Sequence, residues 1–443
     1  MVYGVVVAYV ADLFVSWLKD NAERLKDEFT GGSGRFLQEL VDGARRMWVS
    51  FSATHYTEFE RVAAVDGGLL KFRLANGGLL VFASAYAVGP QIDVRDFECA
   101  LAYPPDKKYA TLLMKTLELR VAVKAVEQMP EGSVLLLDDS MIGLLSTPLI
   151  TPSRSPRDFG KRLLRLLTEL EKLVSEAVAR KVMLISVAKV SSSTSLRDYL
   201  LSLLHRSEVI KLKAMGYIEP EDMQTVEAVL SAAFRNPVKA LKTVRNMKAK
   251  YGSLLDKIES LVEQVSANTT DMLILSRCCV DTGFSRPLVI GASSRLRDQH
   301  SHALQNVEEY VERKLLLSGD AAVEMYGLLN RMRFLPAVVS TYIRFDNNDY
   351  PLKVDVAAGS LGLSQKFFEV DLAEPLKNVE EFSEVVSCLR QLYGSREVYN
   401  VWLYEADRRA RLRRSDVRLL LELLEKQVGP VELSRRSWPE PPD

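Results

Sequence analysis

The sequence has few of the residues that carry thiol or imidazole chemistry. Its 443 residues include 4 cysteines and 4 histidines. The cysteines form no C-x-x-C pair, so neither a disulfide scaffold nor a structural zinc site is expected. His300 and His302 have no acidic or cysteine neighbour at metal-binding spacing, and we expect both on the surface. Carboxylates are therefore the candidates for any catalytic or metal-binding role.

The sequence also lacks an excess of charge of either sign. The 58 Lys+Arg and 58 Asp+Glu residues give a formal net charge of zero, so a surface that binds nucleic acid would have to be local. No G-x-x-x-x-G-K-[ST] loop is present, which argues against an ATP-driven motor. No G-x-S-x-G elbow is present either, which argues against a serine hydrolase of that type.

Long hydrophobic runs are missing as well. The most apolar segment, residues 2–18, follows no positively charged region, and Asp12 interrupts it. It is too short and too polar for a membrane span. We interpret it as a packing or partner-binding helix and expect a cytoplasmic protein without a membrane contact.

What is present is an ordinary globular composition, 47% hydrophobic and 26% charged, long enough for two or three units with a core. Changes of pattern divide the chain into five regions. These are an N-terminal helical arm (1–58), the first part of a core (59–204), a charged helical insertion (205–270), the second part of the core (271–427) and a tail (428–443).

The first part of the core predicts an α/β fold. An apolar strand at 61–65 ends at Asp66-Gly67-Gly68, and the turn Asn76-Gly77-Gly78 predicts a hairpin before a third strand at 94–103. A helix at 109–128, a strand at 134–137, a helix and a strand at 182–187 follow. We predict a mixed sheet flanked by helices, with further strands at 288–290, 338–345 and 352–356 and a final helical region over 401–427.

Three acids stand where this pattern brings functional groups together. Asp66 and Asp138 each follow an apolar strand, and two carboxylates at neighbouring strand ends could share a Mg²⁺ or Mn²⁺ ion. Glu118 lies on an apolar helix stripe, so it is expected to point inward and to need a partner, either a cationic side chain or a metal ion. The alternative for Asp66 is an ordinary turn aspartate.

Cationic residues also follow predicted elements. Lys189 comes directly after a buried strand and could bind a phosphate, although a surface lysine is the plain alternative. Tyr399 and Asp407 flank the apolar run 401–403. Five arginines follow within 408–414, which suits contact with a phosphate backbone; the alternative is a solvated helix face paired with glutamates.

The ordered set of motifs resembles the NurA nuclease family of archaea and some bacteria. The resemblance covers about residues 59–425, with the helical insertion matching poorly. Its motifs are Val65-Asp66-Gly67-Gly68, Glu118-Leu119-Arg120, Leu137-Asp138-Asp139-Ser140, Ala188-Lys189, Pro351-Leu352-Lys353-Val354-Asp355, Tyr399 and Glu405-Ala406-Asp407-Arg408.

The resemblance implies a fold, an activity and partners. The fold is an RNase H-like core, and the activity is a metal-dependent DNA nuclease with single-strand endonuclease and 5′→3′ exonuclease action, usually with Mn²⁺. The implied partners are single- and double-stranded DNA ends, a second copy of the chain, and a HerA-type hexameric ATPase. In the family this pair resects DNA double-strand breaks alongside the double-strand-break-processing nuclease–ATPase complex.

Transferred to this sequence, the resemblance gives roles to single residues. Asp66, Glu118, Asp138 and Asp407 would hold Mn²⁺ or Mg²⁺, Tyr399 would position a phosphate or the attacking water, and Lys189, Arg408, Arg409 and Arg411 would hold the DNA backbone. The chain departs from the family pattern at Gly68 (usually serine), Asp139 (usually glycine) and Asp407 (commonly histidine). Two alternatives therefore stay open: a catalytically weakened dimeric DNA-clamp subunit, and another RNase H-like nuclease such as a resolvase or an RNA-cleaving enzyme.

Overall fold

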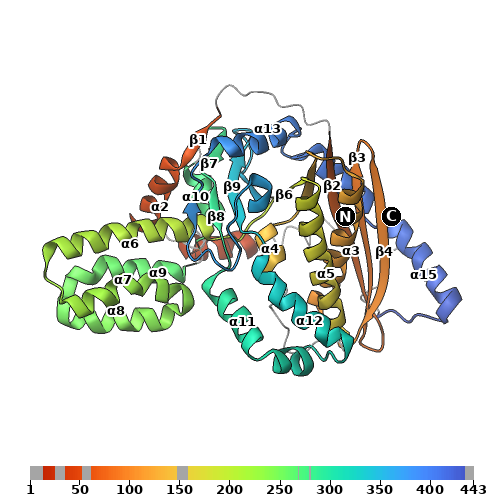
Figure 1. The fold of residues 1–443 in the computed structure, drawn as a ribbon, viewed down its shortest axis with the longest axis horizontal. Coiled ribbons are helices and arrows are strands. Elements are labelled where there is room, and N and C mark those ends of the chain that lie inside the picture. Colours follow the sequence, from red (N-terminus) through yellow and green to blue (C-terminus); the bar gives the residue numbers. More distant parts are fainter. Residues whose placement is uncertain are drawn as a thin grey trace. The chain divides into compact units, whose positions relative to one another are not determined.

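The computed structural model describes residues 13–24, 35–51, 61–146, 158–267, 269–278 and 281–434. The chain divides into two compact units (Figure 1). One contains residues 1–48 and 192–280, and the other contains residues 49–191 and 281–443. Every candidate site residue belongs to the second unit. Part of the predicted partner-binding helix (2–12) and most of the tail (435–443) lie outside the described residues.

The second unit is built on one mixed sheet. In the described residues its strand order is β1 (Trp48–Ser50), β7 (Gly283–Ser285), β9 (Val338–Arg344), β10 (Leu352–Ala357), β6 (Met183–Ala188), β5 (Val134–Asp138), β2 (Val62–Arg73), β3 (Leu79–Gly89), β4 (Ile92–Ala102), while β8 (Leu288–Ile290) pairs with β9 and with β11 (Glu374–Pro375). Strands β2 and β6 run parallel to β5, whereas β2, β3 and β4 form an antiparallel meander. The β2–β3 turn contains Gly77 with φ of +83°, a conformation that favours glycine.

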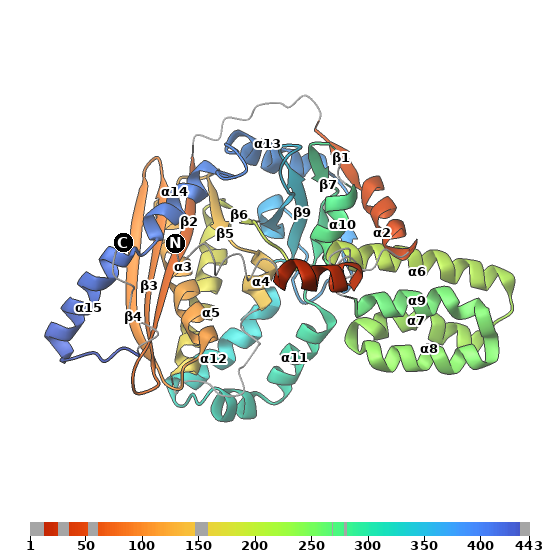
Figure 2. The same ribbon diagram turned by 180° about the vertical axis from the view of Figure 1, so that it is seen from behind.

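Helices cover both faces of this sheet (Figure 2). Because side chains alternate along a strand, Ala63 and Val65 of β2 face one layer and Val62 and Ala64 face the other. The first layer contains α3 (Lys107–Gln128), α5 (Phe159–Ala179), α11 (Ser294–Gln305) and α12 (Asp320–Arg331). The second layer contains α13 (Ser383–Gln391) and α14 (Val401–Ala410).

A third, smaller core lies near the β2–β3 turn, where β2 ends and β3 begins. There Phe72 and Phe82 pack with Val417 of α15 (Arg414–Val428). The final helical region is thus two helices, separated at residues 411–413. The predicted fold class, an α/β fold with a mixed sheet flanked by helices and a helical N-terminal arm, is confirmed.

Two sequence-based expectations are wrong in detail. Strand β2 does not end at Asp66 but continues through Gly67 and Gly68 to Arg73. Pairing with β3 holds this segment extended, with Asp66 opposite Tyr86 and Gly68 opposite Ser84. His300 is buried rather than on the surface: its ring stacks on Phe368 with centroids 4.2 Å apart.

The first unit is described mainly as helices. A helix covers residues 13–24, and α2 (Arg35–Arg46) follows. The later segment contains α6 (Ser195–Met215), α7 (Pro220–Arg235), α8 (Pro237–Tyr251), the short 3₁₀ helix η2 (Gly252–Leu255), α9 (Asp256–Val265) and α10 (Asp271–Cys278). Among the described residues no helix is long and apolar enough to cross a membrane.

Candidate functional site

Asp66 and Asp138 lie on neighbouring parallel strands. Val65 of β2 pairs with Leu137 of β5, so the residues that follow them, Asp66 and Asp138, stand side by side. Both belong to the sheet positions that face α14. Asp66 is buried, and 16% of the Asp138 side chain is exposed. Two carboxylates therefore share a site that water reaches poorly.

The pKa of Asp66 responds to burial and to the charges of three other acids. Burial, the negative charge of Asp138 and that of Glu118 raise the pKa of Asp66 to about 8, and Asp407 adds a smaller increase. The Gly67 amide, which donates a 2.7 Å hydrogen bond to Asp66 Oδ1, opposes this shift. The charges of the three other acids proposed as metal ligands therefore all act on Asp66.

Glu118 reaches the site from the opposite face of the sheet. It lies on α3, and its carboxylate rests against Gly67: a Cβ on that residue would be 2.3 Å from Glu118 Oε1. Lys115 donates to the other carboxylate oxygen at 2.7 Å. Burial raises the pKa of Glu118 while Lys115 lowers it, and burial prevails. Within the described part of the chain, Glu118 Oε1 is buried without a hydrogen-bond partner.

Gly68 leaves room for the end of α14, the helix that carries Asp407. A Cβ on Gly68 would lie 2.1 Å from the Ala410 carbonyl oxygen, and Ser84 Oγ donates to that same oxygen at 2.5 Å. The glycine therefore allows the end of α14 to pack directly on β2 and β3. Asp407, one turn earlier on α14, accepts from Arg411 at 2.7 Å.

Lys189 and Tyr399 complete the site. Lys189 Nζ lies 2.9 Å from Asp138 Oδ2 and 4.5 Å from the centroid of the Tyr399 ring. Burial and the nearby Asp138, Asp66 and Asp407 raise the pKa of Tyr399 far above its usual range. Its buried hydroxyl has no hydrogen bond of regular geometry to any described residue. Asn400 starts α14 by accepting from two backbone amides, which fixes the position of Tyr399 next to the helix.

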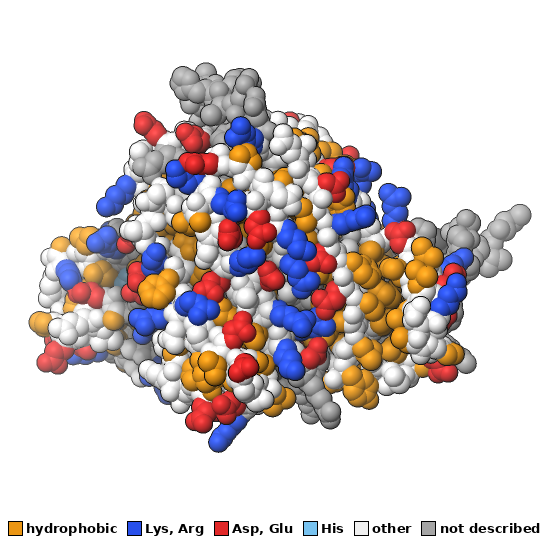
Figure 3. Space-filling view, turned by 45° about the vertical axis from the view of Figure 1, so that its right-hand side comes forward, with side chains coloured by type: hydrophobic (Ala, Val, Ile, Leu, Met, Phe, Trp, Pro, Cys, Tyr) orange, Lys and Arg blue, Asp and Glu red, His pale blue; other side chains and the backbone are white. Residues whose placement is uncertain are grey.

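The arginine cluster is paired with acids of the same chain. Arg408 and Arg409 bind Glu405 at 2.8 and 2.7 Å, and Arg411 binds Asp407. For Arg408 and Arg409 this is the paired helix face that the sequence analysis kept as an alternative. Figure 3 likewise shows Lys and Arg side chains interleaved with Asp and Glu on the face it presents. A role of these arginines in DNA binding stays a prediction.

Sequence reasoning missed Lys115. Its ammonium group bridges Glu118 at 2.7 Å and Asp139 at 2.9 Å. Burial lowers the pKa of Lys115, but the two carboxylates together raise it above its ordinary value. The spacing of Lys115 and Glu118, three residues apart on a helix, was the available signal.

A buried network beside Asp138 gives a place to Lys353 and Asp355, whose motif was noted in the sequence without a role. Lys353 and Asp355 on β10 form a 2.9 Å ion pair, and only 1% of either side chain is exposed. Ser140 donates to Asp355 at 2.9 Å and accepts from Lys353 at 3.0 Å. Asp355 thus holds the residue that follows Asp138 and Asp139 in the chain, and it fixes the start of α4 (Met141–Ser146).

The side chains around Asp66 suit a hard divalent cation. They supply carboxylate oxygens, one of which is a buried oxygen of Glu118 without a hydrogen-bond partner among the described residues, and burial together with their mutual repulsion raises the pKa of Asp66. Among the described residues, however, no three carboxylate, imidazole or thiol groups already converge at metal-binding distances. The ammonium groups of Lys115 and Lys189 instead pair with these acids.

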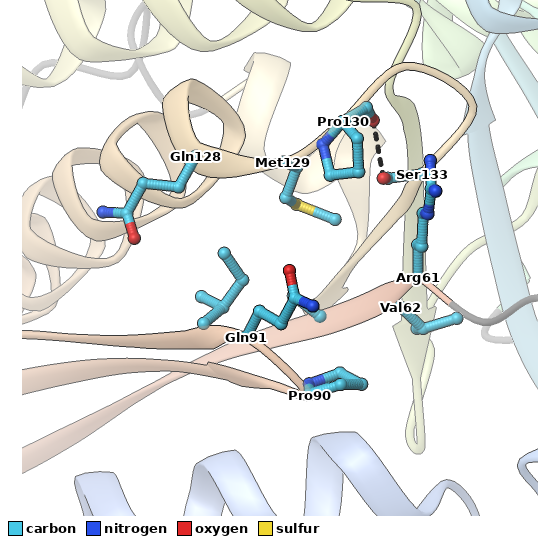
Figure 4. A pocket seen from close by; sticks show the side chains of 10 residues that line it. Arg61, Val62, Pro90, Gln91, Gln128, Met129, Pro130 and Ser133 are labelled. Atoms are coloured by element: carbon cyan, nitrogen blue, oxygen red, sulfur yellow. Dashed lines mark hydrogen bonds between the residues drawn. The ribbon is translucent and has the colours of Figure 1, made fainter.

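A separate cavity of about 360 Å³ lies at the start of β2 and β5 (Figure 4). Arg61, Gln91, Gln128 and Met129 line it, and Ser133 donates to the Pro130 carbonyl at its edge. Among the described residues that line it there is no carboxylate, and none of the candidate acids belongs to its wall.

Comparison with known proteins points to one family. The family model described as the NurA domain matches residues 60–412. A crystal structure of NurA with manganese shares 12% identity at a TM-score of 0.42, with 94% of this chain and 98% of that chain covered. A crystal structure of NurA bound to dAMP and manganese shares 12% identity at a TM-score of 0.39, with 93% and 97% covered. No curated protein sequence matches the chain.

Proposed function

The chain belongs to the NurA domain family, as its motifs predicted, and on that premise we propose that it is a divalent-metal-dependent DNA nuclease. The observation that carries the proposal is the placement of the acids. Asp66 and Asp138 stand side by side on β2 and β5, and the buried Oε1 of Glu118, which has no hydrogen-bond partner among the described residues, rests against Gly67. Burial and the charges of Asp138, Glu118 and Asp407 raise the pKa of Asp66. Grouping four acids costs folding free energy, which a bound cation offsets by neutralising their repulsion.

Each residue has a distinct part in the proposed mechanism. Asp66, Glu118 and Asp138 would hold the cation, with Asp407 beside them. The cation supplies Lewis-acid activation of a water and charge stabilisation at the phosphate. Lys189 neutralises Asp138 in the free protein and would turn to the phosphate when substrate arrives. The buried Tyr399 hydroxyl, which lacks a regular partner, would donate to a phosphate oxygen or to the attacking water.

We propose the finer functional description on the basis of the family. It comprises single-strand endonuclease and 5′→3′ exonuclease activity in double-strand-break resection, Mn²⁺ as the preferred ion, a homodimer, and a HerA-type hexameric ATPase as partner. Manganese and dAMP are present in crystal structures named as NurA, and this supports a metal-dependent enzyme that acts on nucleotides.

One experiment tests the nuclease directly. End-labelled single- and double-stranded DNA is incubated with the full chain and Mn²⁺, Mg²⁺ or EDTA, and Asp66→Asn is compared with wild type. Glu127→Gln is the matched control, because Glu127 is exposed on α3 and pairs with Lys172 outside the site. Cleavage that needs metal and is lost only in Asp66→Asn supports the nuclease. If wild type does not cleave, even with the ATPase added, the dimeric clamp becomes the better description.

The third alternative, another RNase H-like nuclease, is separated by substrate competition. The same labelled single-stranded DNA is mixed with unlabelled RNA or unlabelled single-stranded DNA of equal length. A DNA nuclease is inhibited by the unlabelled DNA much more strongly than by RNA. The reverse order would indicate an RNA-cleaving enzyme.

A further inference from the structure

A second cavity adjoins the acid site on the face of the sheet that α3 and α5 cover. It has a volume of about 420 Å³ and lies between the beginning of α3, the short helix α4 and the beginning of α5. Its wall has an apolar part that includes Leu144, Phe159 and Leu163. Its polar part includes Lys107, Lys108 and Lys115. All of these residues belong to the same compact unit as the acids.

The lysines of this cavity differ in their partners. Lys115 is bound by Glu118 and Asp139, and Asp139 is the carboxylate in the cavity wall. Lys107 and Lys108 are exposed, and neither ammonium group has a carboxylate partner within the described ranges. Two cations at the wall of an apolar cavity are thus available to an anion, while the third is already neutralised.

Lys115 also connects the cavity with the acid site. It lines the cavity and donates to Glu118, which raises the pKa of Asp66. A ligand in the cavity would therefore lie one side chain away from the acids. A ligand with an apolar ring and an adjoining phosphate matches both parts of the wall, since aromatic side chains stack on bases and ammonium groups bind phosphate.

We propose that this cavity is a nucleotide subsite that takes one unstacked nucleotide of single-stranded DNA, next to the phosphate to be cleaved. The inference rests on the proposed nuclease function and adds the place at which one nucleotide of the single strand is held. The volume is in the range of small-molecule sites, and a base can enter it only after leaving the stack of a duplex. The base lies against Phe159 and Leu163, and its phosphate lies at Lys107 and Lys108.

The proposal is tested by binding in EDTA, where metal-dependent cleavage cannot occur. The probe is 2-aminopurine deoxyribonucleoside 5′-monophosphate, whose fluorescence falls on stacking, titrated with the full chain. Lys107→Ser/Lys108→Ser is expected to weaken binding by roughly ten-fold or more, because hydrogen bonds to charged groups are lost. Lys161→Ser is the control, since Lys161 is exposed on α5 and does not line the cavity.

A second variant tests the apolar part. Gly143 of α4 lines the cavity, and a Cβ on it would meet only Ser140 Cβ at 3.7 Å, so Gly143→Leu fits the backbone and fills the space. It should abolish binding of the probe while the lysines stay in place. The subsite would be overturned if Lys107→Ser/Lys108→Ser and Gly143→Leu both bind the probe as tightly as wild type. It would also be overturned if Lys161→Ser loses as much affinity as the double lysine variant, or if wild type does not bind the probe. None of these outcomes depends on cleavage, so failure of the nuclease assay is a separate result.

Discussion

Glu118 and Gly67 contact each other across the sheet. Residue 67 faces the layer of α3, and the missing Cβ leaves room for a carboxylate oxygen that would otherwise lie 2.3 Å away. Asp66 faces the other layer with Tyr399 and α14. The acids are thus supplied from both faces of one sheet, and this glycine allows them to meet.

Gly67→Ala should therefore displace Glu118 from the site. The added methyl group meets Glu118 Oε1 and also Met114 Cγ, at 2.8 Å, so the helix side chains must shift. We expect a loss of about 1–3 kcal/mol in unfolding free energy, as for other overpacked sites, together with weaker Mn²⁺ binding. Denaturant unfolding and a Mn²⁺ titration measure the two effects. Gly359→Ala is the control, because its nearest neighbour would be 3.8 Å away, and equal Mn²⁺ affinity in Gly67→Ala would contradict the contact.

Gly68→Ser, which restores the residue usual in the family, should be harmful in this chain. The new Cβ would lie 2.1 Å from the Ala410 carbonyl oxygen and 2.6 Å from Ser84 Oγ, so the end of α14 must move. We predict lower cleavage activity, with partial recovery in Gly68→Ser/Ser84→Gly, which removes one of the two clashes. Initial cleavage rates at saturating Mn²⁺ are the measurement. Full activity of the single variant would show that α14 does not depend on this contact.

The metal-free protein should lose stability as the pH rises. The pKa of Asp66 is about 8 in the folded protein, whereas an ordinary aspartate has a pKa of 3.8. Between these two pH values the folded protein therefore holds a proton that the unfolded chain releases. This contribution is complete below pH 4 and is lost as the pH rises to about 8, by at most about 1.4 kcal/mol per pH unit. The measurement is the free energy of unfolding of wild type and of Asp66→Asn in EDTA, at several pH values from 5 to 8. Asp66→Asn should show the flatter profile, and parallel profiles would contradict the raised pKa.

The buried pair of Lys353 and Asp355 should behave as one unit. Lys353→Met leaves the buried Asp355 carboxylate without its cation, which should cost about 3–5 kcal/mol, whereas Lys353→Met/Asp355→Leu should cost less than the sum of the single changes. Urea unfolding of the four proteins in the cycle gives the coupling energy. Additive costs would mean that the two charges do not interact across their 2.9 Å contact.

Much of the fold was predictable because the strands are rich in apolar residues and bounded by clear turns. The pattern around Asn76-Gly77-Gly78 located the β2–β3 hairpin, and the apolar run before Asp138 located β5. The pattern failed at Gly67-Gly68, which it predicted as the end of a strand. Two glycines indicate a turn in the local sequence, but here they accommodate Glu118 and Ala410, and those contacts come from residues far along the chain.

The candidate site was predictable only in part for a related reason. Asp66, Asp138 and Glu118 lie on elements whose periodicity shows which side is buried. Two contacts depend on the packing of separate elements, and no pattern in the neighbouring sequence indicates them. One is the pair of Lys115 with Asp139, and the other is the contact of Lys353 and Asp355 with Ser140. The arginines illustrate the opposite problem, because a dense cationic run in the sequence says nothing about the acids that neutralise it in the fold.

The most direct test of the shared acid site is a titration of the metal-free protein with Mn²⁺. The electron paramagnetic resonance signal of the free ion measures how much Mn²⁺ stays unbound at each step. Wild type and Glu127→Gln should bind Mn²⁺ equally, and Asp66→Asn and Glu118→Gln should each bind it at least about ten-fold more weakly, because each removes a charged oxygen ligand. Equal affinity in all four proteins, with folding intact, would contradict the assignment of these acids as one metal site.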